Sequence, residues 1–318
     1  MTAAESQHRF RVMVAFALVY FFWGSTYLGI GIAVEHIPPF LMTGTRFLIA
    51  GVAMLAWCAI RGRGIAISLG EGLRLGVIGC LLLSISNPVL ARAEKIVPTG
   101  LAALILAITP LWFLVIDAWI MSGDHVPPRG LLGLALGIVG VSVLLWPKLT
   151  STTSLGHREF LAALTLLGGS LSWALGSVLA KRWHMKVDPF SGSGWEMAIA
   201  GAVNLIAAFS FGEQTHAQWT PRGIGAIVYL IIFGSWVGYS AYIWLLQNVP
   251  VQKVATYAYV NPVVAVFLGW LVLHERVDGY ILAGSAIVVA GVALVTSAKV
   301  RSKSGVEHVE EMPACEST

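Results

Sequence analysis

Eight long stretches without any Asp, Glu, Lys or Arg constrain the fold of this chain more than any other feature. The shortest is 75–91 and the longest is 223–252. A helix rises about 1.5 Å per residue, so about 20 residues cross a hydrocarbon layer of about 30 Å. Each stretch is therefore long enough for about one transmembrane helix. The eight stretches are 12–34, 75–91, 96–116, 130–147, 160–180, 223–252, 254–274 and 279–298.

Two further apolar segments contain one charge each. Segment 39–60 contains Arg46, and segment 189–212 contains Glu196. With these two included, we predict an all-α polytopic membrane protein with ten transmembrane helices. Composition agrees, because 11% of the 318 residues are charged, against about 25% in soluble domains. Ordinary soluble enzymes, disordered chains and secreted disulfide scaffolds are poor interpretations of such a sequence. The three cysteines provide no disulfide framework, and the net charge of +4 does not indicate a nucleic-acid partner.

The Lys and Arg residues outside the spans predict the orientation. Ten spans place both termini on the same side of the membrane. If that side is the cytoplasm, 13 Lys and Arg residues lie on inner segments and six on outer segments, as the positive-inside rule requires. We therefore predict cytoplasmic N- and C-termini, with 299–318 as a disordered cytoplasmic tail. Nothing at the N-terminus is typical of a cleavable signal peptide.

The two halves of the sequence resemble each other. A shift of 150 in residue number superimposes 22–55 on 172–205 with eight identities, and these include matched tryptophans, Trp23 and Trp173. Shifts of 151 and 152 align later parts of the halves, including Pro110 with Pro262. Apolar composition alone does not produce matched Trp and Pro at one nearly constant offset.

We predict two domains, 11–147 and 160–298, on either side of a Ser/Thr-rich linker, Thr150 to Ser154. Each domain holds five predicted spans. Because five is odd, the second domain enters the membrane from the opposite side, and the repeats are inverted. Inverted repeats are typical of secondary transporters, which bind substrate near the midplane where the halves meet.

Motifs at both ends of the repeated region resemble an EamA domain. The opening motifs are Trp23-Gly24-Ser25-Thr26-Tyr27, Pro38-Pro39, and Arg46 with Ala50-Gly51; the closing motif runs from Tyr257 to Val266 and is followed by Glu275. The region 11–298 resembles the EamA family of the ten-span drug/metabolite transporter superfamily, and within it the YedA-type exporters. The resemblance implies a multi-pass protein of a prokaryotic inner membrane with a small-molecule substrate. One departure is that Asp124 stands where the second half has Glu275, so a role for paired glutamates does not carry over.

Three charged residues within or near the spans are candidates for transport. Arg46 lies seven residues beyond Pro39, about 10 Å below the outer face. It is a candidate anchor for a substrate carboxylate or a closing contact, and the structural alternative is a snorkelling Arg. Glu196 is a candidate proton-coupling group, with structural pairing as the alternative. Asp117 is a second coupling candidate, although snorkelling at the inner end of its span explains it adequately.

Polar and aromatic residues within the spans recur at spacings that place them on one helix face. An aromatic wall with a few amides suits a cavity for small amphipathic metabolites, whereas the alternative for each residue is packing between helices. Pro110 and Pro262 are predicted hinges, because each removes a backbone hydrogen bond within a span. The predicted substrate-binding residues are Trp23, Tyr27, Arg46, Ser84, Asn87, Trp173, Ser177, Tyr239, Tyr242, Tyr257 and Asn261.

These features predict a secondary transporter that exports small amphipathic metabolites or drugs, amino-acid-like compounds above all, by alternating access. We expect no cofactor, no metal and no nucleic-acid partner; coupling to protons and the oligomeric state stay open. An uncoupled facilitator is the main alternative. An intramembrane enzyme needs a mid-span nucleophile and base, and all eight histidines lie near predicted helix ends or in loops. A passive channel predicts a ring of polar or charged residues that the sequence does not show.

Overall fold

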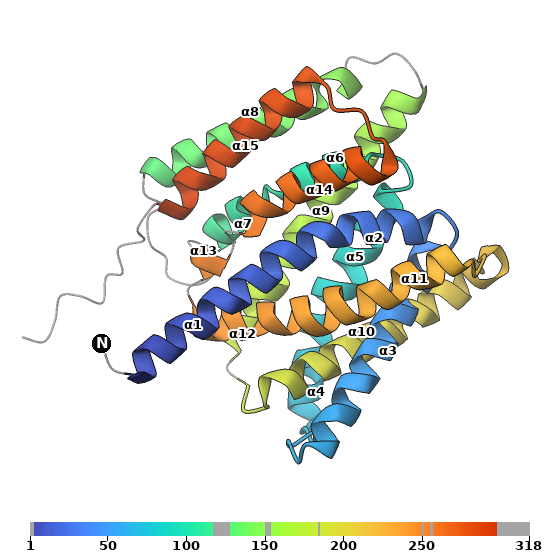
Figure 1. Ribbon diagram of the computed structural model, residues 1–318, viewed down its shortest axis with the longest axis vertical. Coiled ribbons are helices and arrows are strands. Elements are labelled where there is room, and N and C mark those ends of the chain that lie inside the picture. Colours follow the sequence, from blue (N-terminus) through green and yellow to red (C-terminus); the bar gives the residue numbers. More distant parts are fainter. Residues whose placement is uncertain are drawn as a thin grey trace, which may run out of the picture.

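The computed structural model describes residues 3–116, 128–149, 154–183, 185–249, 251–254 and 257–297, and these residues form helices and connections without any strand (Figure 1). The first half contains α1 (Ala3–Leu18), η1 (Val19–Trp23), α2 (Gly24–Val34), α3 (Pro39–Ile60), α4 (Leu69–Gly79), η2 (Cys80–Ile85), α5 (Ser86–Ala93), α6 (Thr99–Leu106), α7 (Thr109–Ile116) and α8 (Pro128–Leu149). The second half contains α9 (Ser154–Arg182), α10 (Pro189–Ser210), η4 (Glu213–His216), α11 (Pro221–Tyr229), η5 (Leu230–Tyr239), α12 (Ser240–Asn248), α13 (Val251–Val254), α14 (Tyr257–Leu273) and α15 (Gly279–Ser297).

Five of the helical segments are long and apolar enough to cross a membrane. They are Glu5–Val34, Pro39–Ile60, Leu69–Ala93, Gly156–Arg182 and Pro221–Asn248. Shorter apolar helices cover Thr99–Phe113, Pro128–Gly140, Val260–Leu273 and Gly279–Gly291. Many large apolar side chains on these helices are exposed, among them Phe21, Ile206 and Leu282. A bilayer is the solvent in which such an exposed apolar surface is stable.

Three of the long segments pass through a π-helix. The π-helices η2 and η5 begin at Cys80 and Leu230. The offset that superimposes the start of the two halves also relates these two positions, so η2 and η5 occupy matching places. The third, η1, interrupts the first segment, and its counterpart α9 is a continuous α-helix. A π-helix turns the following side chains away from the α-helical register and is frequent at functional sites.

Helices α3 and α10 cross in close contact (Figure 1). A β-carbon added at Gly44 would lie 2.8 Å from Leu205, and one added at Gly194 would lie 3.0 Å from Leu55. The offset of the sequence repeat relates Gly44 to Gly194 and, in the opposite direction, Leu205 to Leu55. Contacts that are reciprocal in this way require a local two-fold axis. The helices run antiparallel, so this axis is perpendicular to them.

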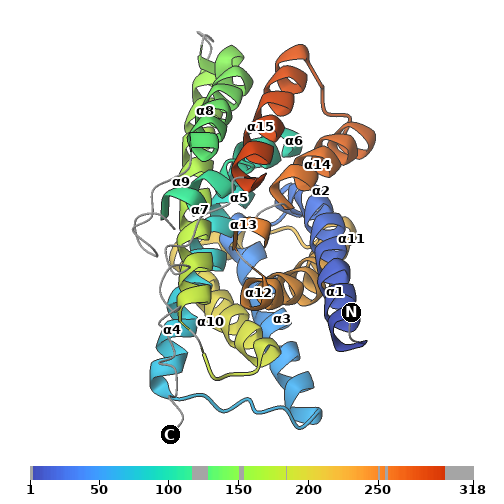
Figure 2. The same ribbon diagram turned by 90° about the vertical axis from the view of Figure 1, so that its left-hand side faces the viewer.

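Helices α8 and α15 repeat the same arrangement, and Figure 2 shows them together at one end of the molecule. A β-carbon added at Gly140 would lie 3.1 Å from the Gly284 carbonyl oxygen, and one added at Gly291 would lie 2.8 Å from the Gly133 carbonyl oxygen. The repeat offset of this region, 151, relates Gly133 to Gly284 and Gly140 to Gly291. The contacts are therefore reciprocal again, and the two helices run antiparallel. Small residues allow this close backbone approach.

One predicted hinge differs from expectation. Pro110 is the second residue of α7, and a two-residue turn at Ala107 and Ile108 already separates α7 from α6. The helix is therefore interrupted before the proline, which occupies the start of a helix, where its missing N–H is harmless. Pro262 lies inside α14, as expected. Asp117, the linker residues 150–153 and the predicted tail 299–318 lie outside the described residues.

Candidate functional site: an aromatic cavity with one buried arginine

A central cavity with a volume of about 90 Å³ lies between the two halves. The first half contributes residues from η1, α2, α3, η2, α5, α6 and α7, and the second half contributes residues from α9, η5 and α14. Eight of the eleven predicted substrate-binding residues line this cavity. They are Trp23, Tyr27, Arg46, Asn87, Trp173, Tyr239, Tyr257 and Asn261.

The two matched tryptophans meet at this cavity. The rings of Trp23 and Trp173 pack edge to face with their centroids 5.3 Å apart. Tyr257 packs edge to face on Trp23 at 5.4 Å, and Tyr242 lies 4.7 Å from the same ring. The Trp23 indole is fixed in place because its Nε1 donates a hydrogen bond to the Gly234 carbonyl oxygen at 3.1 Å. The wall is therefore a rigid aromatic cluster contributed by both halves.

The other three predicted residues lie outside the lining. Ser84 donates a hydrogen bond to the Ala200 carbonyl oxygen at 3.2 Å. Ser177 and Tyr242 share a hydrogen bond of 2.6 Å, and Trp173 Nε1 donates to the Tyr242 hydroxyl at 3.2 Å. Ser177 and Tyr242 therefore support the aromatic wall from behind.

Arg46 is the one charged residue that lines the cavity among the described residues. The residue is 4% exposed, its Nε donates to the Ser235 hydroxyl at 2.9 Å, and its Nη1 has no hydrogen-bond partner. No carboxylate of the described residues forms an ion pair with it. A buried guanidinium without a counter-charge is costly, so this position is electrostatically prepared for a negatively charged ligand group.

Ser235 was not singled out from the sequence, although a signal for it exists. A shift of 151 in residue number pairs it with Ser84, which was predicted as a site residue. The π-helix η5 contains Ser235 and Gly234, and a β-carbon added at Gly234 would lie 2.5 Å from Arg46 Nη2. Glycine at this position therefore leaves room for the guanidinium.

Glu196 lies at the boundary between the central cavity and a second one. It is 2% exposed and accepts a hydrogen bond of 2.7 Å from the Tyr239 hydroxyl. Tyr239 lines the central cavity, whereas Glu196 lines a second cavity together with Lys181 and Asp188. This hydrogen bond therefore connects the two cavities through one carboxylate and one phenol.

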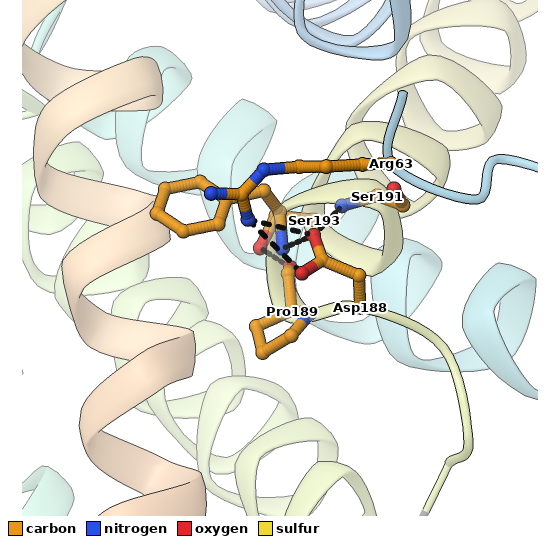
Figure 3. A network of polar contacts seen from close by, with 6 residues as sticks. Arg63, Asp188, Pro189, Ser191 and Ser193 are labelled. Atoms are coloured by element: carbon orange, nitrogen blue, oxygen red, sulfur yellow. Dashed lines mark hydrogen bonds and ion pairs between the residues drawn. The ribbon is translucent and has the colours of Figure 1, made fainter. Parts of the chain in front are cut away.

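The second cavity lies beside an ion pair that joins the two halves (Figure 3). Arg63 follows α3, and its Nη1 lies 3.0 Å from Asp188 Oδ2. Asp188 also caps α10, because its Oδ1 accepts hydrogen bonds from the backbone N–H groups of Phe190 and Ser191. The guanidinium lies 5.2 Å from the Trp57 ring and 4.8 Å from the Phe190 ring. The ion pair closes this end of the interface between α3 and α10.

A cavity between two helical halves, with one buried arginine in an aromatic wall and apolar helices around it, suits a protein that carries small molecules across a membrane. The EamA-like transporter family matches this chain twice, over residues 10–146 and 160–297. The chain therefore belongs to the EamA-like transporter family, and it contains the family's domain twice.

Individual relatives support the same class. The "Uncharacterized inner membrane transporter YedA" of Escherichia coli K12 is 37% identical over 296 residues, which cover 92% of this chain and 94% of the relative. The "Probable amino-acid metabolite efflux pump" of Salmonella typhimurium is 26% identical over 86% of this chain and 91% of its own length. A solved crystal structure shares the fold with a TM-score of 0.67, at 19% identity, over 90% of this chain and 96% of that chain.

The family and the relatives make this chain a multi-pass transporter of the inner membrane, and they indicate a transporter rather than an enzyme. The predicted family, membrane location and transport class are therefore confirmed. Such a protein has a small-molecule substrate.

Proposed function

We propose that this protein is a secondary transporter that exports small amphipathic carboxylates, amino-acid-like compounds above all, by alternating access. The observation that carries the proposal is Arg46, a buried guanidinium with an unpartnered Nη1 in the wall of an aromatic cavity. A substrate carboxylate would supply the missing counter-charge, and the rings of Trp23, Trp173 and Tyr257 would enclose its apolar part.

The proposed membrane arrangement has ten spans, built as two inverted five-helix repeats over 11–147 and 160–298. The reciprocal, antiparallel contacts of α3 with α10 and of α8 with α15 support it. A two-fold axis perpendicular to transmembrane helices lies in the membrane plane, as inverted repeats require. The distribution of Lys and Arg supports cytoplasmic termini. The Asp188 end of the molecule is then the inner end.

The proposed transport cycle rocks one half against the other around the fixed cavity. The hydrogen bond between Glu196 and Tyr239, and the ion pair between Arg63 and Asp188, lie between the central cavity and the inner end, so both must rearrange when that end opens. Pro262 and the interruption before Pro110 are the proposed points of bending. Glu196 is the proposed proton-coupling group, and Asp117 stays a second candidate. The export direction is supported by the printed name of the Salmonella relative.

The substrate proposal can be tested with three ligands that share one phenyl ring. We expect purified protein in proteoliposomes to transport phenylalanine and 3-phenylpropionate but not phenethylamine, which lacks the carboxylate. Arg46→Ala should abolish this preference. Arg92→Ala, at an exposed arginine on α5, is the matched control and should keep it. Equal transport of all three ligands by the wild type would refute a carboxylate anchor at Arg46.

A transporter without ion coupling is the second candidate function, because no Asp or Glu among the described residues lines the central cavity. The same vesicles decide between the two. A pH gradient that drives phenylalanine above its equilibrium distribution indicates coupling, whereas equilibration alone indicates a facilitator.

A further inference from the structure

Unpartnered oxygen atoms gather at the end of the molecule opposite Asp188. Both carboxylate oxygens of Glu94, which follows α5, are shielded from solvent and lack a hydrogen-bond partner. The hydroxyl of Thr99, at the start of α6, is likewise without a partner, and Thr99 is 2% exposed. Most buried polar atoms in proteins have partners, so three orphans on two nearby residues require an explanation.

A second carboxylate reaches this place from the other half of the chain. Glu275 follows α14, and its two oxygens accept hydrogen bonds from the backbone N–H groups of Thr99 at 2.7 Å and Gly100 at 3.2 Å. Glu275 therefore caps the N-terminus of α6, and these hydrogen bonds stabilise the negative charge of the Glu275 carboxylate. The contact joins the two halves at this end, as the Arg63–Asp188 ion pair joins them at the other.

Thr99 lies between the two carboxylates. A β-carbon added at Gly269 would touch both Glu275 Oε2 and, at 2.9 Å, the Thr99 hydroxyl. A β-carbon added at Gly31 would lie 2.8 Å from the Thr99 methyl group and 3.8 Å from Glu94 Oε2. The hydroxyl of Thr99 is therefore directed toward Glu275, and its methyl group is directed toward Glu94.

No positive charge of the described residues pairs with Glu94. The helices packed on α5 are α2, α3, η2 and α9. The titratable groups of α2, α3 and η2 are Tyr27, Arg46, whose Nε is bonded to Ser235, and the thiols of Cys58 and Cys80. The ionisable residues of α9 are His157, Arg158, Glu159, Lys181 and Arg182. The nearby cations Arg92, Lys95 and Arg276 are exposed to solvent. Burial raises the pKa of the Glu94 carboxyl well above its ordinary value, and the negative charge of Glu275 raises it further.

Glu94 is also linked to the central cavity. Tyr27 lines that cavity and lies close enough to Glu94 for a carboxylate charge there to act on its phenol group. Gly31, which lies beside Glu94 Oε2, is four residues after Tyr27 on the same face of α2. A change of charge at Glu94 therefore acts on a residue of the proposed substrate site.

We propose that Glu94 is a proton-binding site at the outer end of the transporter, occupied while Glu275 caps α6 and vacated when this end opens. On opening, the Glu94 carboxyl releases its proton to water and becomes a carboxylate. A proton fits better than a metal cation, because hard cations take six or more oxygen ligands and only three oxygens here lack partners. The inference rests on the proposed transport function, in which Glu196 is the proposed proton-coupling group, and it adds a second proton site at the outer end.

The test compares Glu94→Gln with the wild type in two measurements. The first is infrared difference spectroscopy of the purified protein during a pH titration. We expect a protonated-carboxyl band that is absent from Glu94→Gln and present in the control Glu35→Gln, whose partly exposed carboxylate lies at the same end. A band unchanged in Glu94→Gln would overturn the proposal.

The second measurement separates coupling from transport. In proteoliposomes, Glu94→Gln should keep phenylalanine exchange at equal concentrations on both sides and lose its stimulation by a pH gradient. Stimulation that survives in Glu94→Gln, or that follows a Na⁺ gradient instead, overturns the inference and leaves the transport proposal intact. A wild type that exchanges nothing refutes the transport proposal, and the infrared result then still decides whether Glu94 holds a proton.

Glu275→Gln keeps the inference testable if Glu94→Gln does not fold. Its amide oxygen can still accept one of the two hydrogen bonds from the start of α6, but the negative charge beside Glu94 is removed. Since that charge raises the pKa of Glu94, the infrared band should titrate at a lower pH. An unchanged titration would contradict the proposed interaction of the two carboxyls.

Discussion

Arg46 on α3 and Glu196 on α10 occupy matching positions in the two halves, yet they carry opposite charges and face different spaces. The helices that carry them cross through reciprocal glycine contacts, so the backbone there is close to two-fold symmetric. Arg46 lines the central cavity and donates to Ser235, whereas Glu196 lines the second cavity and accepts from Tyr239. The comparison shows that a nearly symmetric backbone carries asymmetric side chains, so that the proposed substrate anchor and the proposed coupling group lie in different halves.

Removal of the Arg46 guanidinium should have the largest effect. Arg46→Ala deletes the one cation of the described cavity lining, and losing a desolvated charge partner costs about 3 kcal/mol, which corresponds to roughly a hundredfold weaker binding. Binding of phenylalanine, followed by quenching of tryptophan fluorescence, should weaken accordingly. Arg46→Lys should recover part of the affinity, because the charge is kept and the geometry is not. Unchanged affinity in Arg46→Ala would contradict the anchor role.

The symmetric crossing itself should be sensitive to single methyl groups. A β-carbon at Gly201 would overlap the Leu48 backbone, so Gly201→Ala should force α3 and α10 apart at a cost of about 1–3 kcal/mol. Thermal unfolding in detergent should show a lower Tm. Gly225→Ala on α11 is the control, because nothing lies within 4 Å of the added carbon, and it should leave the Tm unchanged or raise it. A tolerated Gly201→Ala would show that the crossing is looser than described.

Glu196 should respond differently from Arg46. Tyr239→Phe removes the hydrogen bond from Tyr239 to the buried carboxylate of Glu196. A hydrogen bond to a charged group contributes about 1.5–3 kcal/mol to stability. Glu196→Gln should keep the preference for carboxylate substrates and weaken the dependence of the transport rate on pH. The measurement is the rate of phenylalanine efflux across a range of pH values in both variants. A Glu196→Gln variant that loses the carboxylate preference would indicate that the two matching residues share one task.

The Arg63–Asp188 ion pair should have the smallest effect. Its side chains are 38% and 29% exposed, and ion pairs at such positions contribute about 1 kcal/mol or less. Arg63→Ala should therefore shift the balance between open and closed inner ends by about fivefold at most. Labelling of a cysteine introduced at Gly192, which lines the second cavity, would report that balance. No change in labelling would show that the pair does not stabilise closure.

The sequence predicted the helical segments well, because charge-free length is a direct consequence of the bilayer. The segment bounded by Arg11 and Glu35 and the segment beginning at Pro39 both appear as helices. The π-helices were not predicted, since their register depends on contacts with other helices. The interruption at Ala107 and Ile108 was missed for a related reason: Pro110 signals a disturbance in a helix but does not place it.

The candidate site was predicted in part. Trp23 and Tyr27 follow from helical spacing, and Arg46 follows from the cost of a charge in a span. Ser235 and Glu94 were missed, because the importance of each residue depends on its neighbours in the folded structure and not on its position in the sequence. Glu94 lies beside ordinary charged loop residues in the sequence, and only the fold shields its carboxylate and brings Glu275 next to it.

The sequence by itself determined the class of solvent, the duplication and the family, because hydropathy and internal similarity are properties of the chain alone. The tertiary structure decided which polar groups have partners. It left Nη1 of Arg46 unpaired in the cavity, joined Glu196 to Tyr239 and shielded the carboxylate oxygens of Glu94 from solvent without a donor. Burial and pairing depend on where distant segments of the chain meet, and in this transporter those contacts leave the polar atoms on which the proposed substrate and proton sites rest.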